Sequence, residues 1–158
     1  MFGDHVAVLD HGRVVQEGTP AELAAKPGSG FVADLTGAVV LSGVARTRSD
    51  GLTEVELDGG GRVVSSETAE GAVAATLHPW DVTLDDPGQG AATGSARNHL
   101  TGPVIAVTPL GNRVRVTVAT PQAVTAEITP EAAAALGVRS GQEAVASFKA
   151  TAVRLLPR

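Results

Sequence analysis

The 158 residues of this chain suit one domain or two small β-barrels in tandem, and hydrophobic residues at 43% against charged residues at 18% predict a folded chain. Only four aromatic side chains and a net charge of −5 argue against a nucleic-acid-binding surface, which needs stacking platforms and positive charge. The absence of cysteine excludes disulfides and thiolate chemistry, and no apolar run approaches the roughly 20 residues that cross a bilayer.

Charge is distributed unevenly along the chain. Residues 1–94 carry five basic and fourteen acidic side chains, net −9, whereas residues 95–158 carry seven basic and three acidic side chains, net +4. The asymmetry favours an anion site in the second part, although a solvated charge pattern without a ligand explains it equally well.

The first predicted elements are a hairpin and two short helices. Strands at 6–9 and 13–16 flank the turn Asp10-His11-Gly12. Thr19 as N-cap, with Pro20 at the first helical position, predicts a helix over 20–25, and a further helical segment is expected over 30–35.

The run from Asp4 to Pro20, which contains E-G-T-P, resembles the end of an ABC-transporter ATPase domain, and Phe31-Val32-Ala33 continues the pattern. The resemblance implies that residues 1–36 are the C-terminal tail of such a domain. The sequence contains no G-x-x-x-x-G-K-[ST] loop for nucleotide phosphates. We therefore expect no ATPase activity from this chain, and ATP would bind only to an ATPase domain outside it.

Short β runs separated by glycine follow from residue 37. Strands predicted at 39–42, 53–57, 62–65, 73–77 and 82–84 suit a five-stranded barrel within a first module, residues 37–86. Aperiodic residues 87–94 read as a linker.

A second module is predicted at 95–158. Its strands are expected at 103–107, 113–118, 124–128, 144–149 and 152–156. A helix begins after Thr129, with Pro130 at its first position, and ends at Gly137.

The two modules read as a tandem repeat. Leu41-Ser42-Gly43 matches Leu100-Thr101-Gly102, and residues 77–84 match 148–155, with a length difference that roughly equals the inserted helix. The predicted fold is mainly β: tandem OB-like barrels with one short helix inserted in the second, preceded by the hairpin and short helices. The first copy has His78-Pro79-Trp80 in place of Lys149-Ala150-Thr151, so we expect the first copy to be structural and the second to bind.

The candidate site combines S-A-R-N at the start of the second module with K-A-T near its end. A tetrahedral dianion is held by donors alone, namely backbone N–H groups, hydroxyls and cationic side chains. Taken singly, Ser95 could simply begin a strand, Arg97 could pair with Glu127 or Glu143, and Lys149 could be a solvated edge lysine. The four histidines are scattered, so no metal site is predicted. The candidate residues are Ser95, Ala96, Arg97, Asn98, Lys149, Ala150 and Thr151.

These motifs, with a T-x-E-A helix between them, resemble the molybdenum-binding Mop module as it occurs in the transport-associated OB (TOBE) region of molybdate-importer ATPases. The resemblance implies molybdate or tungstate as the ligand, contacted by Ser95, Arg97, Lys149, Thr151 and the N–H groups of Ala96 and Ala150, with Asn98 fixing the turn. It also implies a homodimer formed through the barrel modules.

The parent protein would be cytoplasmic, at the inner face of the membrane, and would associate with permease subunits. The module would then regulate import when it binds the oxyanion. The alternative is a structural TOBE dimerisation module that binds nothing, in an importer for sulfate or another substrate.

Overall fold

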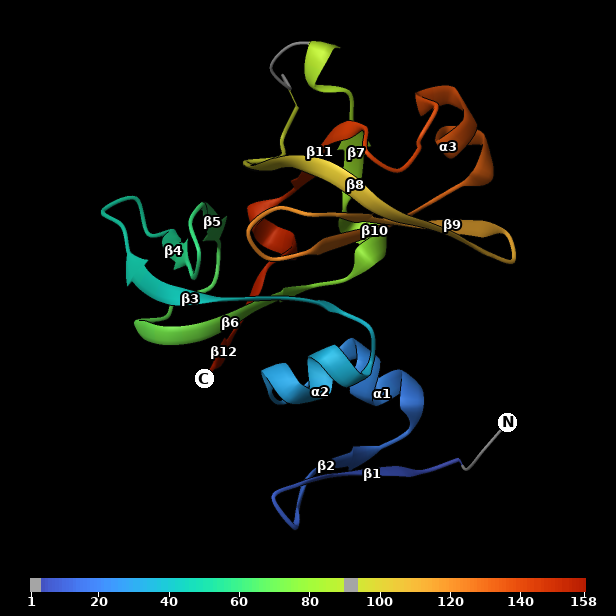
Figure 1. Ribbon diagram of the computed structural model, residues 1–158. Coiled ribbons are helices and arrows are strands. Elements are labelled where there is room, and N and C mark those ends of the chain that lie inside the picture. Colours follow the sequence, from blue (N-terminus) through green and yellow to red (C-terminus); the bar gives the residue numbers. More distant parts are fainter. Residues whose placement is uncertain (1–3, 90–93) are drawn as a thin grey trace.

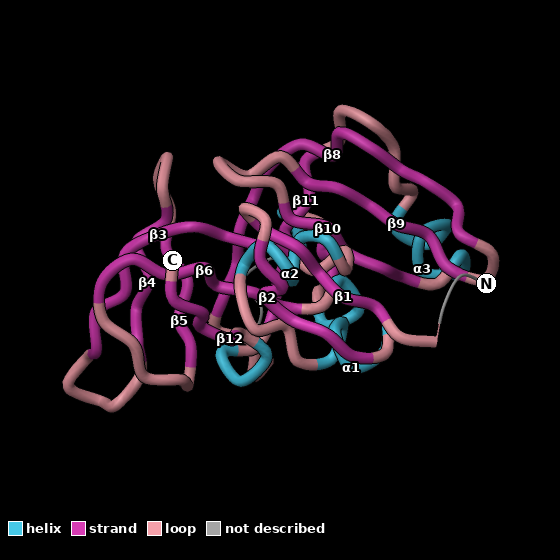
Figure 2. Tube along the Cα trace, turned by 90° about the horizontal axis from the view of Figure 1, so that it is seen from below, coloured by secondary structure: helices cyan, strands magenta, loops and turns pink. Residues whose placement is uncertain are grey.

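Strands make up most of the regular secondary structure of the protein. The computed structural model describes residues 4–89 and 94–158, in which the strands form three antiparallel sheets and the helices are short. Figure 2 shows the strands in magenta through most of the molecule, with helices confined to brief segments. The predicted mainly β fold is therefore confirmed.

The N-terminal segment is a two-stranded hairpin followed by two helices. Its elements are β1 (Val6–Asp10), β2 (Arg13–Gly18), α1 (Pro20–Ala25) and α2 (Gly30–Leu35). The Thr19 hydroxyl accepts a hydrogen bond from the Glu22 N–H, and the Glu22 carboxylate accepts one from the Thr19 N–H. This reciprocal capping box fixes the start of α1, and its hydrogen bonds to the carboxylate lower the pKa of Glu22.

The N-terminal segment packs against the larger sheets through α2. Val8, Leu23 and Val32 form a small core of their own beneath the hairpin. Ala33 of α2 packs against Ala74 and Leu156, which belong to a larger sheet. Figure 1 shows the hairpin at one end of the molecule, with α1 and α2 between it and the larger sheets.

Ten strands form two five-stranded sheets. The first sheet has the order β12-β6-β3-β4-β5 and the second the order β10-β9-β8-β11-β7. Their strands are β3 (Val39–Thr47), β4 (Thr53–Leu57), β5 (Arg62–Ser65), β6 (Gly71–Leu77), β7 (Thr83–Asp85), β8 (Asn98–Leu110), β9 (Arg113–Val118), β10 (Val124–Ile128), β11 (Glu143–Phe148) and β12 (Arg154–Pro157).

The two sheets exchange their last strands. β7, at the end of the first copy of the repeat, pairs with β11 of the second sheet, whereas β12, at the end of the second copy, pairs with β6 of the first sheet. This exchange of strands was not predicted from the sequence. Each copy thus contributes one strand to the sheet of the other. Buried side chains from both sheets form one continuous hydrophobic core.

The turns before the exchanged strands have the same shape in both copies. Short 3₁₀ turns η1 (Pro79–Asp81) and η3 (Ala150–Ala152) precede β7 and β12. The flanking residues have nearly equal backbone angles: φ −82° and ψ 143° at His78 against −76° and 146° at Lys149, then −93° and 124° at Val82 against −89° and 120° at Val153. The matched sequences therefore have matched local structure.

β8 begins earlier and ends later than the strand predicted at 103–107. It starts at Asn98 and pairs first with β11, as far as the partners Pro103 and Glu143, and then with β9 from Val104 onward. The Pro103 residue lacks an N–H donor and lies where β8 changes partner, while its carbonyl accepts a hydrogen bond from Ala119 N–H at 2.8 Å. A proline at that changeover removes no ladder bond that the strand needs.

The remaining elements are η2 (Pro87–Gln89) and α3 (Pro130–Leu136). Thr129 caps α3 through its hydroxyl, and Gly137 ends the helix in the left-handed conformation with φ +60°. These are the predicted helix signals. Of the predicted linker at 87–94, residues 90–93 lie outside the described residues, and the proposed division of the chain at this segment stays a prediction.

Candidate functional site

Antiparallel pairing of β8 and β11 brings the two predicted motifs to the same end of one sheet. Ser147 lies opposite His99, and Phe148 opposite Asn98, at the last pairs of this ladder. S-A-R-N leads into β8, and K-A-T directly follows β11, next to these pairs. Residues more than fifty positions apart in the sequence therefore become neighbours. The sheet register, rather than any local motif, assembles the candidate site.

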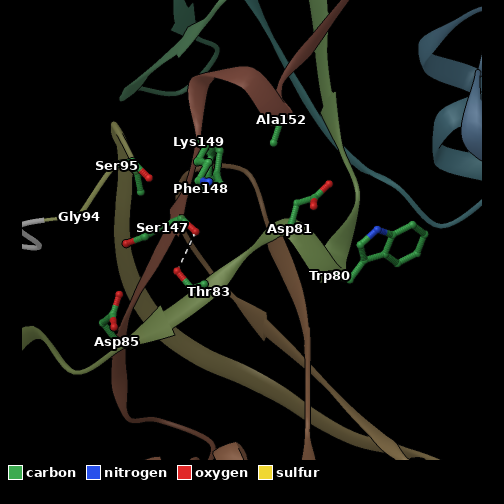
Figure 3. A pocket seen from close by; sticks show the side chains of 11 residues that line it. Trp80, Asp81, Thr83, Asp85, Gly94, Ser95, Ser147, Phe148, Lys149 and Ala152 are labelled. Atoms are coloured by element: carbon green, nitrogen blue, oxygen red, sulfur yellow. Dashed lines mark hydrogen bonds between the residues drawn. The ribbon is translucent and has the colours of Figure 1, made fainter.

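A cavity of about 460 Å³ opens at this end of the sheet. Ser95, Ala96 and Lys149 line it, so members of both motifs face one space. Figure 3 shows Ser95 and Lys149 at neighbouring parts of the rim, with Asp81 and Trp80 on the side formed by η1. The remaining lining residues are Trp80, Asp81, Thr83, Asp85, Gly94, Ser147, Phe148 and Ala152.

Two other residues of the S-A-R-N motif hold the loop. The Arg97 guanidinium donates to the carbonyls of Gly94 at 3.0 Å and Ala96 at 3.4 Å. The Asn98 side chain is buried and makes two hydrogen bonds with β5: its Nδ2 donates to the Val64 carbonyl at 2.9 Å, and its Oδ1 accepts from the Val64 N–H at 2.7 Å. Neither residue lines the cavity in a single chain.

The rest of K-A-T lies in η3. Ala150 is buried, and its carbonyl accepts hydrogen bonds from the Ser66 N–H at 3.2 Å and the Val153 N–H at 3.3 Å. Thr151 is exposed at the turn. The structure thus brings three of the seven predicted residues to the cavity wall and leaves Arg97, Asn98, Ala150 and Thr151 beside it.

Residues 94–155 match the family model described as the TOBE domain. A 32% identity over 158 residues links the chain with the molybdate/tungstate import ATP-binding protein WtpC of Pyrococcus horikoshii, covering 99% of this chain and 43% of that protein. The sn-glycerol-3-phosphate import ATP-binding protein UgpC of Ruegeria pomeroyi is 37% identical over 87 residues, 55% of this chain and 24% of that protein. The chain therefore spans less than half the length of these relatives.

A solved structure of the cytoplasmic molybdate-binding protein ModG, with molybdate bound, superposes with a TM-score of 0.68. The match has 29% sequence identity and covers 75% of this chain and 95% of that one. These findings confirm the resemblance to import ATP-binding subunits and to a molybdenum-binding module.

One side of the cavity is formed by residues that were not predicted as site residues from the sequence. Trp80, Asp81, Thr83 and Asp85 belong to η1 and β7, which reach the site because β7 pairs with β11. Asp81 and Asp85 add two carboxylates to a cavity whose lining includes one ammonium group, that of Lys149. A bound dianion would experience both attraction and repulsion.

The equivalent face of the first copy is nearly filled. Only about 20 Å³ remains there, between Thr76, Leu77, His78, Ala152 and Arg154, with Pro27 of the N-terminal segment and Ala38 just before β3. His78 stacks on Trp80 with ring centroids 4.4 Å apart. The open cavity therefore lies beside the segment that matches the TOBE domain model, where the candidate motifs are.

Within residues 4–89 and 94–158, no three His, Asp or Glu side chains gather closely enough to hold a metal ion. Every helix of that part is too short or too polar to span a bilayer.

Proposed function

We propose that the TOBE domain binds molybdate or tungstate in the cavity beside Lys149 and regulates an ABC importer to whose ATP-binding subunit it belongs. The observation that carries the proposal is that Ser95, Ala96 and Lys149 line one cavity. A hydroxyl, a backbone N–H and an ammonium are donors suited to a tetrahedral oxyanion. Similarity to the WtpC protein and to molybdate-bound ModG supports this choice of ligand.

One chain alone supplies too few hydrogen-bond donors and too little positive charge to hold a dianion tightly. The cavity holds one ammonium and two carboxylates. Each charge-assisted hydrogen bond contributes about 1.5–3 kcal/mol, so micromolar binding needs about four or five of them. Arg97 could supply more if its guanidinium turned from the Gly94 and Ala96 carbonyls toward the ligand.

A second copy of the chain is the other source of donors in this proposal. The cavity volume equals that of about fifteen liquid waters at roughly 30 Å³ each, far more than a five-atom oxyanion fills. Exposed Ile105, Val107 and Leu110 on β8 offer an apolar surface for contact between copies. A homodimer would bring Arg97 or Thr151 of one copy toward the Lys149 of the other.

The wider assignments rest on the same similarities. The parent protein would be cytoplasmic, attached to permease subunits at the inner face of the membrane, with ATP bound by an ATPase domain outside this chain. Oxyanion binding to the folded dimer would report cellular molybdate to the importer.

Titration calorimetry with molybdate and tungstate tests the proposal. We expect micromolar binding by the wild type and at least a tenfold loss in Lys149→Ala. Lys26→Ala is the matched control, because it removes the only other lysine from an exposed position in the N-terminal segment. Equal affinities in the two variants, or no binding by the wild type at millimolar oxyanion, would refute the proposed ligand.

The second candidate is a structural dimerisation module without a ligand, in an importer for another substrate. Two observations favour it: the carboxylates of Asp81 and Asp85 in the cavity, and the 37% identity to a glycerol-3-phosphate importer subunit. Light scattering separates the two. The structural module would be dimeric without any oxyanion and unchanged by its addition, whereas the binding module would dimerise more tightly with molybdate.

A further inference from the structure

His99 connects the two halves of the candidate site directly. Its Nδ1 lies 2.8 Å from the Ser147 hydroxyl oxygen, and its Nε2 lies 3.2 Å from the Ala96 carbonyl oxygen. Ser147 is 2% exposed, lines the cavity and stands two positions before Lys149. One imidazole ring therefore spans from the S-A-R-N loop to β11, the strand that ends just before Lys149.

The hydrogen-bond partners determine which ring nitrogen carries the proton. A carbonyl oxygen only accepts, so the contact with Ala96 requires a proton on Nε2. In the neutral ring Nδ1 is then an acceptor, and the Ser147 hydroxyl must donate its single proton to it. In this state the Ser147 oxygen has only lone pairs to offer the cavity, which is unfavourable for an anion.

Protonation of the ring reverses the second hydrogen bond. The imidazolium donates from both nitrogens, so Nδ1 donates to the Ser147 oxygen and the hydroxyl proton becomes free to turn toward the cavity. A donor replaces a lone pair, and a positive charge is added beside the site. The Ser147 backbone need not move, since its carbonyl already accepts a hydrogen bond from the Thr83 hydroxyl at 3.1 Å.

We propose that Ser147 is a further oxyanion ligand and that His99 is a positioning residue whose protonation makes the Ser147 hydroxyl a donor. Oxyanion binding is then coupled to uptake of a proton. This inference rests on the proposed function, because it names an additional ligand of the same cavity. It predicts that the site binds more tightly as the pH falls through the range in which histidine titrates.

Charged groups on the surrounding elements act in both directions on this coupling. Lys149 on the β11 side, and Arg97, which shares the Ala96 carbonyl with His99, disfavour a second positive charge. Asp85 of β7 and Asp81 of η1 favour it. A bound dianion adds negative charge to that of Asp81 and Asp85, so the ligand itself promotes protonation of His99.

Calorimetric titration with tungstate between pH 6 and pH 8, in buffers of different ionisation enthalpy, tests the coupling. We expect the affinity of the wild type to rise by up to about tenfold for each unit that the pH falls, with net proton uptake. His99→Gln retains polar groups but cannot titrate, so its affinity should vary much less with pH. Ser147→Ala should bind more weakly at low pH and keep only the smaller dependence that the charge of His99 causes. His5→Gln, at an exposed position before β1, is the matched control and should behave as the wild type.

The outcomes distinguish the proposed coupling between His99 and Ser147, here called the relay, from the proposed function on which it rests. Wild-type binding with an unchanged pH dependence in His99→Gln would overturn the relay alone. Nitrogen-15 NMR that finds the proton of neutral His99 on Nδ1 would do the same. No tungstate binding by the wild type at any pH would overturn the proposed function, and the relay with it.

Discussion

Replacement of Asn98 by alanine distinguishes a structural asparagine from a ligand. Both polar atoms of this buried amide bond to the backbone of Val64, and in doing so connect β8 to β5 of the other sheet. Truncation leaves the half-buried N–H and C=O of Val64 without these partners, at a cost of about 1–3 kcal/mol each. We expect Asn98→Ala to lower the free energy of unfolding by about 2–5 kcal/mol, a large part of the stability of a typical domain.

Urea unfolding followed by circular dichroism measures this loss. Asn112→Ala is a matched control in the exposed turn between β8 and β9, and should change stability by less than about 0.5 kcal/mol. The melting temperature of Asn98→Ala should fall by roughly 5–15 °C in a chain of this size. If Asn98→Ala is as stable as the wild type but no longer binds oxyanion, the structural role assigned to Asn98 is wrong.

Three further predictions concern the cavity, the point where β8 changes its pairing partner, and acid stability. Asp85→Asn removes a cavity carboxylate, so calorimetry should show about three- to tenfold tighter molybdate binding; weaker binding would contradict the repulsion. Gly102→Ala places a Cβ against the Ala119 carbonyl, so urea unfolding should show a loss of about 2 kcal/mol, and no loss would disprove the close approach. The hydrogen bond from Arg115 lowers the pKa of Glu127 below its ordinary 4.5. The ionised Glu127 carboxylate therefore stabilises the folded protein above pH 4.5, and this stabilisation is lost as the pH falls through the lower pKa of Glu127 in the folded state. Glu127→Gln should reduce the decline of the unfolding free energy at acid pH, and an unchanged decline would refute this.

The elements with local signals could be predicted from the sequence with small errors. The cap at Thr19, the proline at 130 and the glycine at 137 act within one helical turn, and the helices they delimit have nearly the predicted bounds. The early start of β8 was missed because Asn98 reads as a turn residue, while in the structure its amide bonds to the backbone of another strand.

The strand exchange could not be read from the sequence. β7 and β12 follow matched segments with matched turns, so either could pair with either copy, and only long-range packing decides between them. The presence of Asp85 and Trp80 in the cavity wall follows from that pairing alone. The prediction of Ser95 and Lys149 as neighbours relied on motif resemblance instead, which does not depend on knowing the exchange.

Tungsten provides the most direct test of the site. A crystal of the protein soaked in tungstate and measured at the tungsten absorption edge would locate the metal oxide by its anomalous signal. We predict a strong peak in the cavity, within hydrogen-bonding reach of the Lys149 ammonium and of the Ser95 hydroxyl of the same or a neighbouring copy. A fully occupied peak elsewhere, or none in the cavity at saturating tungstate, would contradict it.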